Sequence, residues 1–214
     1  MTSSLPLDGH GFPKDFFLRA DEEDDAAFYE VPRLVTHIDD AAIGAVGDLY
    51  EELHIDGEVL DLMSSWVSHF RTPPRRLSAL GMNAYELRAN PAAVERIVHD
   101  LNADPTIPLP AESIDDAVCC ASVDYLTRPV EVFRDVARLL RPNGRFVCTF
   151  SNRVFATKAI RAWLYASEDE RCRIVVEYFR RSGLFEPATA VRRTPAGYRG
   201  DPLYAVWAVR SSAP

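Results

Sequence analysis

Short apolar runs alternate with longer stretches of helical spacing along this chain. The runs at 59–62, 76–80, 116–121 and 145–150 have the length of buried strands. Residues 41–53, 84–89 and 129–140 place apolar side chains three or four positions apart, as amphipathic helices do. This alternation predicts an α/β fold, with a parallel sheet covered by helices on both faces.

The remaining segments complete the expected order of elements. We expect a short helix at 65–70, a helical segment at 92–97, a third strand at 98–101 and a Pro-rich loop at 102–113. After residue 150, the pattern predicts helices at 156–164 and 168–182, then strands at 188–193 and 203–209 that pair antiparallel. We expect a single domain over 1–214, with an N-terminal arm and helices in 1–55 and an α/β core in 56–214.

The stretch 58–70, EVLDLMSSWVSHF, runs from a buried strand into a turn of small and polar residues. Ligands of open α/β sheets bind outside the carboxyl ends of such strands. We therefore expect this turn to form part of a ligand site.

Three segments in this order resemble the class I S-adenosylmethionine-dependent methyltransferases, of the methyltransferase type 11 kind. They are VLDL at 59–62, SIDDAVCCASVDYL at 113–126 and VFRDVARLLRPNGRFVCTF at 132–150. The resemblance implies a Rossmann-like, doubly wound, mostly parallel sheet with an antiparallel C-terminal hairpin. It also implies a cytoplasmic enzyme that uses S-adenosyl-L-methionine to methylate a small-molecule or lipid-like acceptor.

Two positions depart from the pattern of that family. The family's first loop is rich in glycine, whereas Met63, Ser64 and Ser65 follow Asp61 here. Serine hydroxyls can partly replace such a loop, because they can bond the carboxylate of the cofactor. At the end of the second strand, Gly81 takes the place of a carboxylate that bonds the ribose.

The missing carboxylate has a cost and a possible replacement. Losing a charge-assisted hydrogen bond costs about 1.5–3 kcal/mol. Asn83 or Glu86 could reach the ribose instead, and the alternative interpretation is that Gly81 simply permits a turn.

The resemblance implies cofactor-binding residues at the ends of four strands. Asp100 is placed near the adenine, although a turn or capping role explains it as well. Tyr125 would line the substrate side or belong to the core. The full implied set is Asp61, Met63, Ser64, Ser65, Gly81, Met82, Asn83, Asp100, Leu101, Asn102, Ala121 and Ser122.

A neutral acceptor oxygen or nitrogen needs a base during methyl transfer. We favour His37 and Tyr29 as catalytic candidates, because the arm before the first strand covers the cofactor in the resembled family. Asp124 and His69 are further candidates, and a structural role is the alternative for each histidine. Residues after Asn152 are expected to shape the acceptor pocket or to form a solvated helix face, namely Arg153, Lys158, Arg161, Trp163 and Tyr165.

Composition limits the partners. The 214 residues carry a net charge of −8, which disfavours nucleic acid as a partner. No apolar run reaches the length of a membrane span, and no signal peptide is expected. The four cysteines form no CxxC pair and no metal-ligand spacing is present, so we expect unpaired thiols and no metal.

The departures in the first loop leave a second hypothesis open. The chain could be a methyltransferase-like binding or scaffold protein that has lost catalysis. A nicotinamide dehydrogenase is disfavoured, because GxGxxG is missing.

Overall fold

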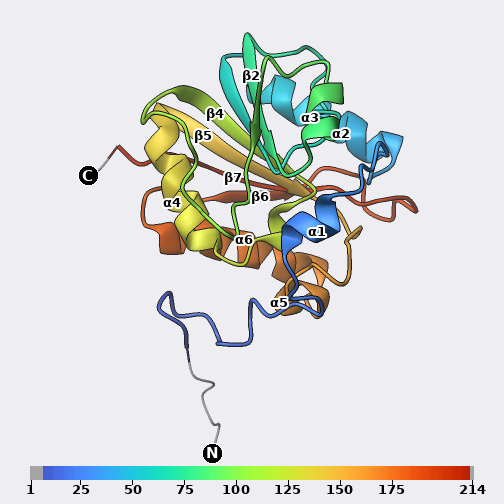
Figure 1. Cartoon of the computed structure of the whole chain (residues 1–214), viewed down its shortest axis with the longest axis vertical. Helices are drawn as coiled ribbons and strands as arrows, with labels where there is room; N and C mark the ends of the chain where they lie inside the picture. Colours follow the sequence, from blue (N-terminus) through green and yellow to red (C-terminus); the bar gives the residue numbers. More distant parts are fainter. Residues whose placement is uncertain (1–6, 213–214) are drawn as a thin grey trace, which may run out of the picture.

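A computed structural model describes residues 7–212 of the chain and contains a seven-stranded sheet in the order β3-β2-β1-β4-β5-β7-β6 (Figure 1). Strands β1 to β5 are parallel, and β7 runs antiparallel to both β5 and β6. This is the Rossmann-like sheet with an antiparallel C-terminal hairpin that the sequence predicts. The strands are β1 (Glu58–Leu62), β2 (Arg76–Gly81), β3 (Glu95–Val98), β4 (Ile114–Cys120), β5 (Leu140–Phe150), β6 (Thr189–Arg192) and β7 (Tyr204–Val209).

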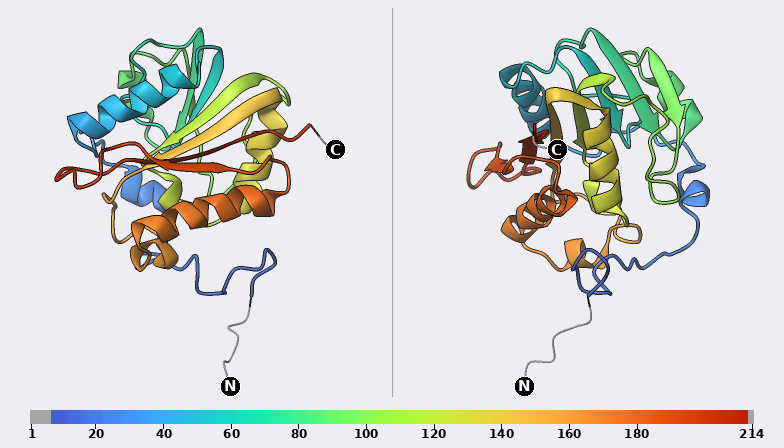
Figure 2. Two further views of the ribbon diagram at one scale, coloured as in Figure 1. Left: turned by 180° about the vertical axis from the view of Figure 1, so that it is seen from behind. Right: turned by 90° about the vertical axis from the view of Figure 1, so that its left-hand side faces the viewer.

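Alternate residues of β1 point to opposite faces of the sheet, and each face carries its own core. Val59 packs with side chains of α2 (Asp40–Glu52), whereas Leu60 and Leu62 pack with α4 (Pro129–Leu139) and α6 (Glu168–Ser182). The two views of Figure 2 show α2 separated from α4 and α6 by the sheet. In the part of the chain described, no helix has the length and apolarity needed to cross a bilayer.

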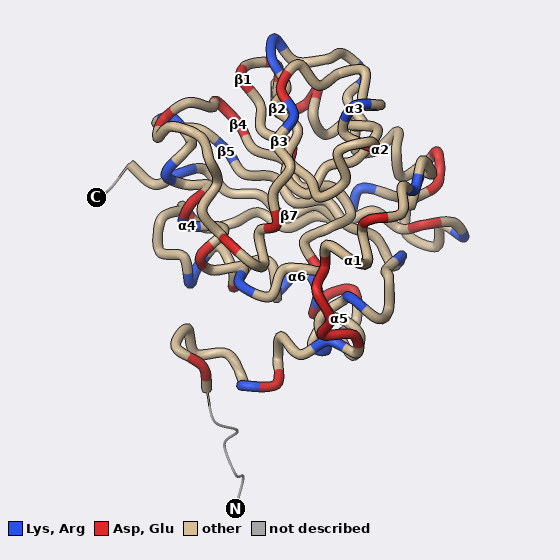
Figure 3. Tube along the Cα trace, in the orientation of Figure 1, with Lys and Arg blue, Asp and Glu red and all other residues tan. Residues whose placement is uncertain are grey.

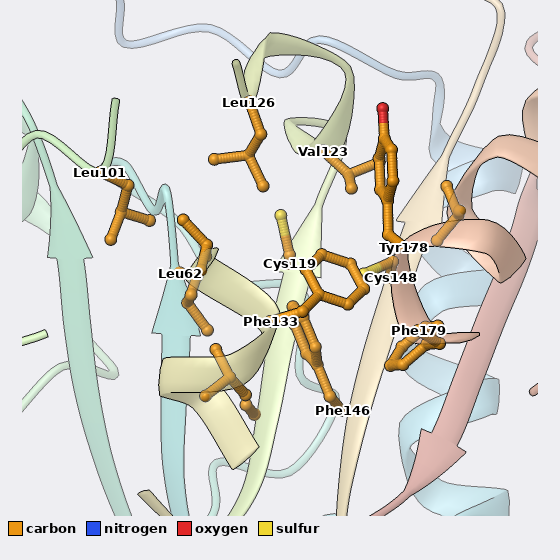
Figure 4. Close-up of a cluster of buried hydrophobic side chains, with 14 of the residues drawn as sticks. Leu62, Leu101, Cys119, Val123, Leu126, Phe133, Phe146, Cys148, Tyr178 and Phe179 are labelled. Atoms are coloured by element: carbon orange, nitrogen blue, oxygen red, sulfur yellow. The ribbon is translucent and has the colours of Figure 1, made fainter. Parts of the chain in front are cut away.

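Aromatic rings fill the larger core, between α4, α6 and the sheet (Figure 4). The ring of Phe133 on α4 lies 4.7 Å from the rings of both Phe146 on β5 and Phe179 on α6. Cys119 and Cys148 face this core as free thiols, and burial raises the pKa of each. These contacts hold the parallel strands rigidly beneath the site.

The predicted helix at 65–70 is wrong, because residues 63–75 connect β1 to β2 without any helix. The predicted helix at 92–97 is also wrong. Strand β3 begins at Glu95, so the third strand lies earlier than expected, and residues 99–102 form the turn after it. The short helix α3 (Ala84–Ala89) has the predicted bounds and ends before Pro91.

The C-terminal part agrees with the sequence at α6 and at the two late strands. Helix α6 begins with a capping box at Ser167 and ends at Gly183, whose φ of 75° is the left-handed conformation that glycine favours. The expected helix at 156–164 is shorter, with only α5 (Arg161–Leu164) formed. A 3₁₀ turn, η1 (Val123–Tyr125), follows β4.

The N-terminal arm has no regular structure from residue 7 until α1 (Asp25–Tyr29), and the expectation for residues 1–6 lies outside the described residues. Figure 3 shows the acidic run 21–25 leading into α1. Asp25 of this run is buried, where it pairs with Arg19 at 2.7 Å and with Lys158 at 3.1 Å. The arm is therefore fastened to the body of the protein by buried charges.

Candidate functional site

A cleft of about 480 Å³ lies outside the carboxyl ends of β1, β2, β3 and β4 and is lined in part by residues of α1 and the following arm segment. Figure 1 shows α1 beside this edge of the sheet. Its size falls in the range of sites for small molecules and cofactors. Eleven of the twelve implied cofactor residues line it, and so do both catalytic candidates. These lining residues are Met63, Ser64, Ser65, Gly81, Met82, Asn83, Asp100, Leu101, Asn102, Ala121, Ser122, Tyr29 and His37.

The floor of the cleft is formed where β1 and β4 end side by side. Met63 after β1 and Ala121 after β4 both have a φ of 52°, a conformation that side chains disfavour. The Ala121 N–H donates to the Thr149 carbonyl at 2.7 Å, and the Ser122 hydroxyl reaches the Met63 carbonyl at 3.4 Å. Both turns therefore adopt a left-handed conformation beside the cleft without glycine.

Asp61 is the implied cofactor residue that does not line the cleft. It lies on the α2 face of β1 and is 4% exposed. The hydroxyls of Ser64 and Ser68 donate to its Oδ2 at 2.7 and 2.6 Å. Burial raises its pKa to about 6, and these two bonds only partly oppose that rise. Asp61 therefore holds the loop after β1 in place through these two hydrogen bonds and does not face the cleft.

The serine hydroxyls of the first loop are thus directed to carboxylates of the protein. Ser65 donates to Glu86 of α3, as Ser64 does to Asp61. The sequence predicts that these hydroxyls bond a cofactor carboxylate, but in this structure both are already used within the fold.

Asn90, at the end of α3, also holds this loop, and the sequence does not predict that role. It is fully buried at the end of α3, and its amide donates to the Ser65 carbonyl at 3.1 Å and to the Ser68 hydroxyl at 2.9 Å. The sequence marks it only as the residue before Pro91, and that position gives no sign of a contact with residues 65–68.

The two departures from the family pattern are coupled in the structure. The loop after β1 crosses the end of β2, where the Ser64 N–H donates to the Leu80 carbonyl at 2.7 Å. A Cβ on Gly81 would lie 2.1 Å from the Ser64 carbonyl oxygen. No side chain fits there, so the route of the loop itself excludes a carboxylate at position 81.

The two side chains proposed to replace that carboxylate are already engaged. Asn83 caps α3 by accepting from the amides of Tyr85 and Glu86, and its own amide donates to the Tyr29 and Glu30 carbonyls. Glu86 accepts from the backbone N–H of Arg33 as well as from Ser65. Both residues therefore fasten the arm and the first loop to α3.

The turn after β3 forms the next wall of the cleft. Asp100 accepts from the backbone N–H groups of Asn102 and Ala103 through one carboxylate oxygen. The Asn102 side chain donates to Asp25 at 2.9 Å and accepts from the Thr127 amide at 2.8 Å. Burial acts to raise the Asp25 pKa, but the bonds from Asn102, Arg19 and Lys158 outweigh it and lower the pKa.

The arm provides the remaining wall and brings the two catalytic candidates into the cleft. Burial lowers the pKa of His37, with Glu86 acting in the opposite direction, so the imidazole is neutral at pH 7. Burial raises the pKa of Tyr29, which keeps its phenol protonated. Of the two, His37 is the one whose protonation state suits a base.

Other predicted residues lie elsewhere. Asp124 is a buried residue of η1, where burial raises its pKa to about 7, and neither it nor His69 lines the cleft. Beyond β5, residues 152–155 do line the cleft. The rest of the expected acceptor segment does not, because Lys158 and Trp163 are buried, Arg161 pairs with Asp15, and Tyr165 is 83% exposed.

Comparison with known proteins agrees with this architecture. Residues 64–148 match the family model described as Methyltransferase domain, Methyltransf_11. Curated proteins give no sequence match to the chain.

Several solved structures share the fold. One is a 1,6-didemethyltoxoflavin-N1-methyltransferase from Burkholderia thailandensis, solved with 1,6-didemethyltoxoflavin and S-adenosylhomocysteine bound. It is 17% identical to this chain, with a TM-score of 0.57, and the match covers 80% of this chain and 79% of that one. A SAM-dependent methyltransferase from Aquifex aeolicus is 14% identical, with a TM-score of 0.56, and the match covers 87% of this chain and 97% of that one.

A third, an S-adenosylmethionine-dependent methyltransferase from Mesorhizobium loti, is 17% identical, with a TM-score of 0.53 over 78% and 98%. At these identities the likeness concerns the fold, while the matched segment connects the sequence to the methyltransferase domain. Residues 64–148 are thus similar in sequence to the methyltransferase domain, and the chain shares its fold with these S-adenosylmethionine-dependent methyltransferases.

Proposed function

We propose that the chain binds S-adenosyl-L-methionine in the cleft and transfers its methyl group to a small-molecule acceptor. The observation that carries this proposal is the convergence of the turns after β1, β2, β3 and β4 on one cleft. In open α/β sheets, this edge at the switch of strand order is where ligands bind.

The residues present fit such a cofactor at both ends of the cleft. Towards β2 and β3, the walls formed by Met82, Asp100 and Leu101 offer an apolar surface with a carboxylate beside it, suited to a purine with an amino group. Towards β1 and β4, the turn residues Met63 and Ala121 line the cleft, and the proposal assigns this end to the amino-acid part of the cofactor. The cofactor would therefore be bound by the turn residues that line the cleft rather than by the serine hydroxyls of the first loop.

Bound there, the cofactor would supply an electrophilic methyl group for the acceptor's nucleophilic oxygen or nitrogen. The protein's part is mainly to position the two reactants. Both catalytic candidates line the cleft, and in this proposal His37, whose lowered pKa favours the neutral imidazole, takes the acceptor's proton while Tyr29 donates a hydrogen bond.

Calorimetric titration with S-adenosylhomocysteine tests the proposal. We expect saturable binding with one site per chain, and an Asp100→Ala variant should bind at least about threefold more weakly. Absence of binding at millimolar ligand would rule out the enzyme.

A second function, a methyltransferase-like binding protein without catalysis, is favoured by one observation. The hydroxyls of Ser64 and Ser65 point to Asp61 and Glu86, and residues 63–75 lack the helix whose N-terminus would help to bind an anion. This alternative predicts that the cleft binds small molecules while S-adenosylhomocysteine does not compete with them.

A further inference from the structure

The wall of the cleft opposite the cofactor turns is built mainly from aromatic rings. Phe155, from the segment after β5, lies 5.2 Å from the ring of His37, 5.5 Å from that of Phe28 and 5.9 Å from that of Tyr125. Tyr125 is held in this cluster because its hydroxyl accepts from the Phe155 N–H at 2.8 Å. Rings contributed by α1, the arm, η1 and the segment after β5 thus meet at one place.

A guanidinium lies among these rings. The Arg33 side chain sits 4.5 Å from the ring centre of Phe28 and 5.5 Å from that of Phe155. Its two terminal nitrogens donate to the carbonyls of Phe28 and Val31, which fix its plane. These partners are neutral, so they hold the group in place without cancelling its charge.

The half-buried Arg33 has no carboxylate partner among residues 7–212, and this sets it apart from two other cations near the arm. Arg19 and Lys158 both pair with Asp25. Arg153, which lines the same side of the cleft, has only a 3.4 Å pair with Asp201.

Glu86 is an acidic residue that contacts the backbone of Arg33. One of its oxygens accepts from the Arg33 backbone N–H and the other from Ser65, so both are used. In a chain with a net charge of −8, a guanidinium without an ion pair among the described residues is suited to an anion, and Arg153 beside it has a single 3.4 Å pair.

We propose, on the basis of the function above, that the methyl acceptor is a planar aromatic compound carrying an anionic group. The anionic group pairs with Arg33, with Arg153 at the entrance, and the ring packs against Phe155. This arrangement leaves a nucleophilic substituent of the ring on the side of His37. The aromatic rings of the protein provide an apolar surface that matches a planar acceptor, and the guanidinium of Arg33 orients the acceptor through its anionic group.

The test uses 4-hydroxybenzoate, with 4-hydroxybenzamide and 4-hydroxycyclohexanecarboxylate as matched probes that lack the charge or the aromatic ring. Each probe is titrated into the full-length protein, with and without saturating S-adenosylhomocysteine, by ligand-observed NMR. We expect 4-hydroxybenzoate to bind at least tenfold more tightly than either analogue. Phenyl phosphate, in a parallel titration, distinguishes a phosphate from a carboxylate as the preferred anion.

Three variants locate the site. Arg33→Gln should weaken 4-hydroxybenzoate at least tenfold while leaving the affinities for 4-hydroxybenzamide and S-adenosylhomocysteine within twofold. Phe155→Leu should weaken the acid and the amide alike, by about threefold or more. Arg88→Gln is the matched control, because Arg88 is exposed on α3 and does not line the cleft, and it should change nothing.

The outcomes separate this proposal from the one it rests on. Failure of S-adenosylhomocysteine to bind overturns the proposed function. If it binds but the acid and the amide bind equally, or Arg33→Gln has no effect on the acid, the aromatic anion is the wrong acceptor class and methyl transfer stands.

Discussion

The loops after β1 and β4 meet at the floor of the cleft, but different parts of the chain hold them in place. The β4 loop is fixed by backbone bonds, from Ala121 to the Thr149 carbonyl and from Tyr125 to the Ser122 carbonyl. The β1 loop also has one backbone bond, from Ser64 to the Leu80 carbonyl, but it depends in addition on side chains, because Ser64 and Ser68 donate to Asp61.

This difference teaches how a glycine-poor first loop keeps its shape. Glycine would allow the turn by its backbone alone. Here a buried carboxylate gathers hydroxyls under the loop, and the loop in turn lies across the end of β2. The β1 loop should therefore be sensitive to substitution and to pH, and the β4 loop should not.

The largest effect is expected for Gly81→Ala, which places a methyl group against the Ser64 carbonyl oxygen. Moving that carbonyl breaks the Ser64–Leu80 hydrogen bond. We expect a loss of about 3 kcal/mol in the free energy of unfolding, measured by urea denaturation.

Gly44→Ala serves as the control for Gly81→Ala, because Gly44 lies in α2 and a Cβ there meets no atom closer than 4.0 Å. This control should be neutral or stabilise the protein by up to about 1 kcal/mol. If both substitutions changed the free energy of unfolding equally, the close contact between the β1 loop and the end of β2 would be contradicted.

Asp61→Asn tests the charge beneath the loop through pH. The folded-state pKa of Asp61, about 6, lies above its ordinary value, so the folded state holds the proton more tightly than the unfolded state. The contribution of this group to stability is therefore most favourable at pH 4, falls as pH rises to about 6 and is constant above.

The asparagine variant lacks this titration, so its stability relative to the natural protein should increase by roughly 2–3 kcal/mol between pH 4 and pH 8. Urea denaturation of both proteins across this pH range gives the difference between their free energies of unfolding. The contributions of all other titrating groups cancel in that difference. A difference that does not change with pH would contradict a buried, charged Asp61.

The smallest pair of effects compares one hydroxyl in each loop. Ser68→Ala removes a donor to Asp61 and an acceptor for Asn90, and should cost about 1–2 kcal/mol. Ser122→Ala removes bonds to the Cys120 and Met63 carbonyls of 3.0 and 3.4 Å, and should cost less than about 1 kcal/mol. If Ser122 proves the more costly, the contrast between the loops is wrong.

Much of the fold could be predicted because the local signals agree. Helix α4 has a Pro in its first turn and one apolar face, and α6 has a capping box and a terminal glycine, so their bounds were predicted closely. The segment 65–70 also has helical spacing, but its serines bond to Asp61, Glu86 and Asn90, which are distant in sequence or lie beneath it.

The sequence predicts which turns line the cleft, but not which contacts their side chains make. The order of strands places the turns at residues 63–65, 81–83, 100–102 and 121–122 along one edge. The sequence could not show that Asp61 faces α2, because that depends on which face of β1 each residue occupies. Nor could it show that Gly81 is a consequence of the loop above it.

The central claim, that these turns form one cofactor site, is tested most directly by hydrogen–deuterium exchange with and without 1 mM S-adenosylhomocysteine. We predict slower exchange of backbone amides in residues 63–65, 82–83, 100–102 and 121–122, and no change in α4 or β6. Unchanged exchange in all four turns, or protection confined to another part of the molecule, would contradict the claim.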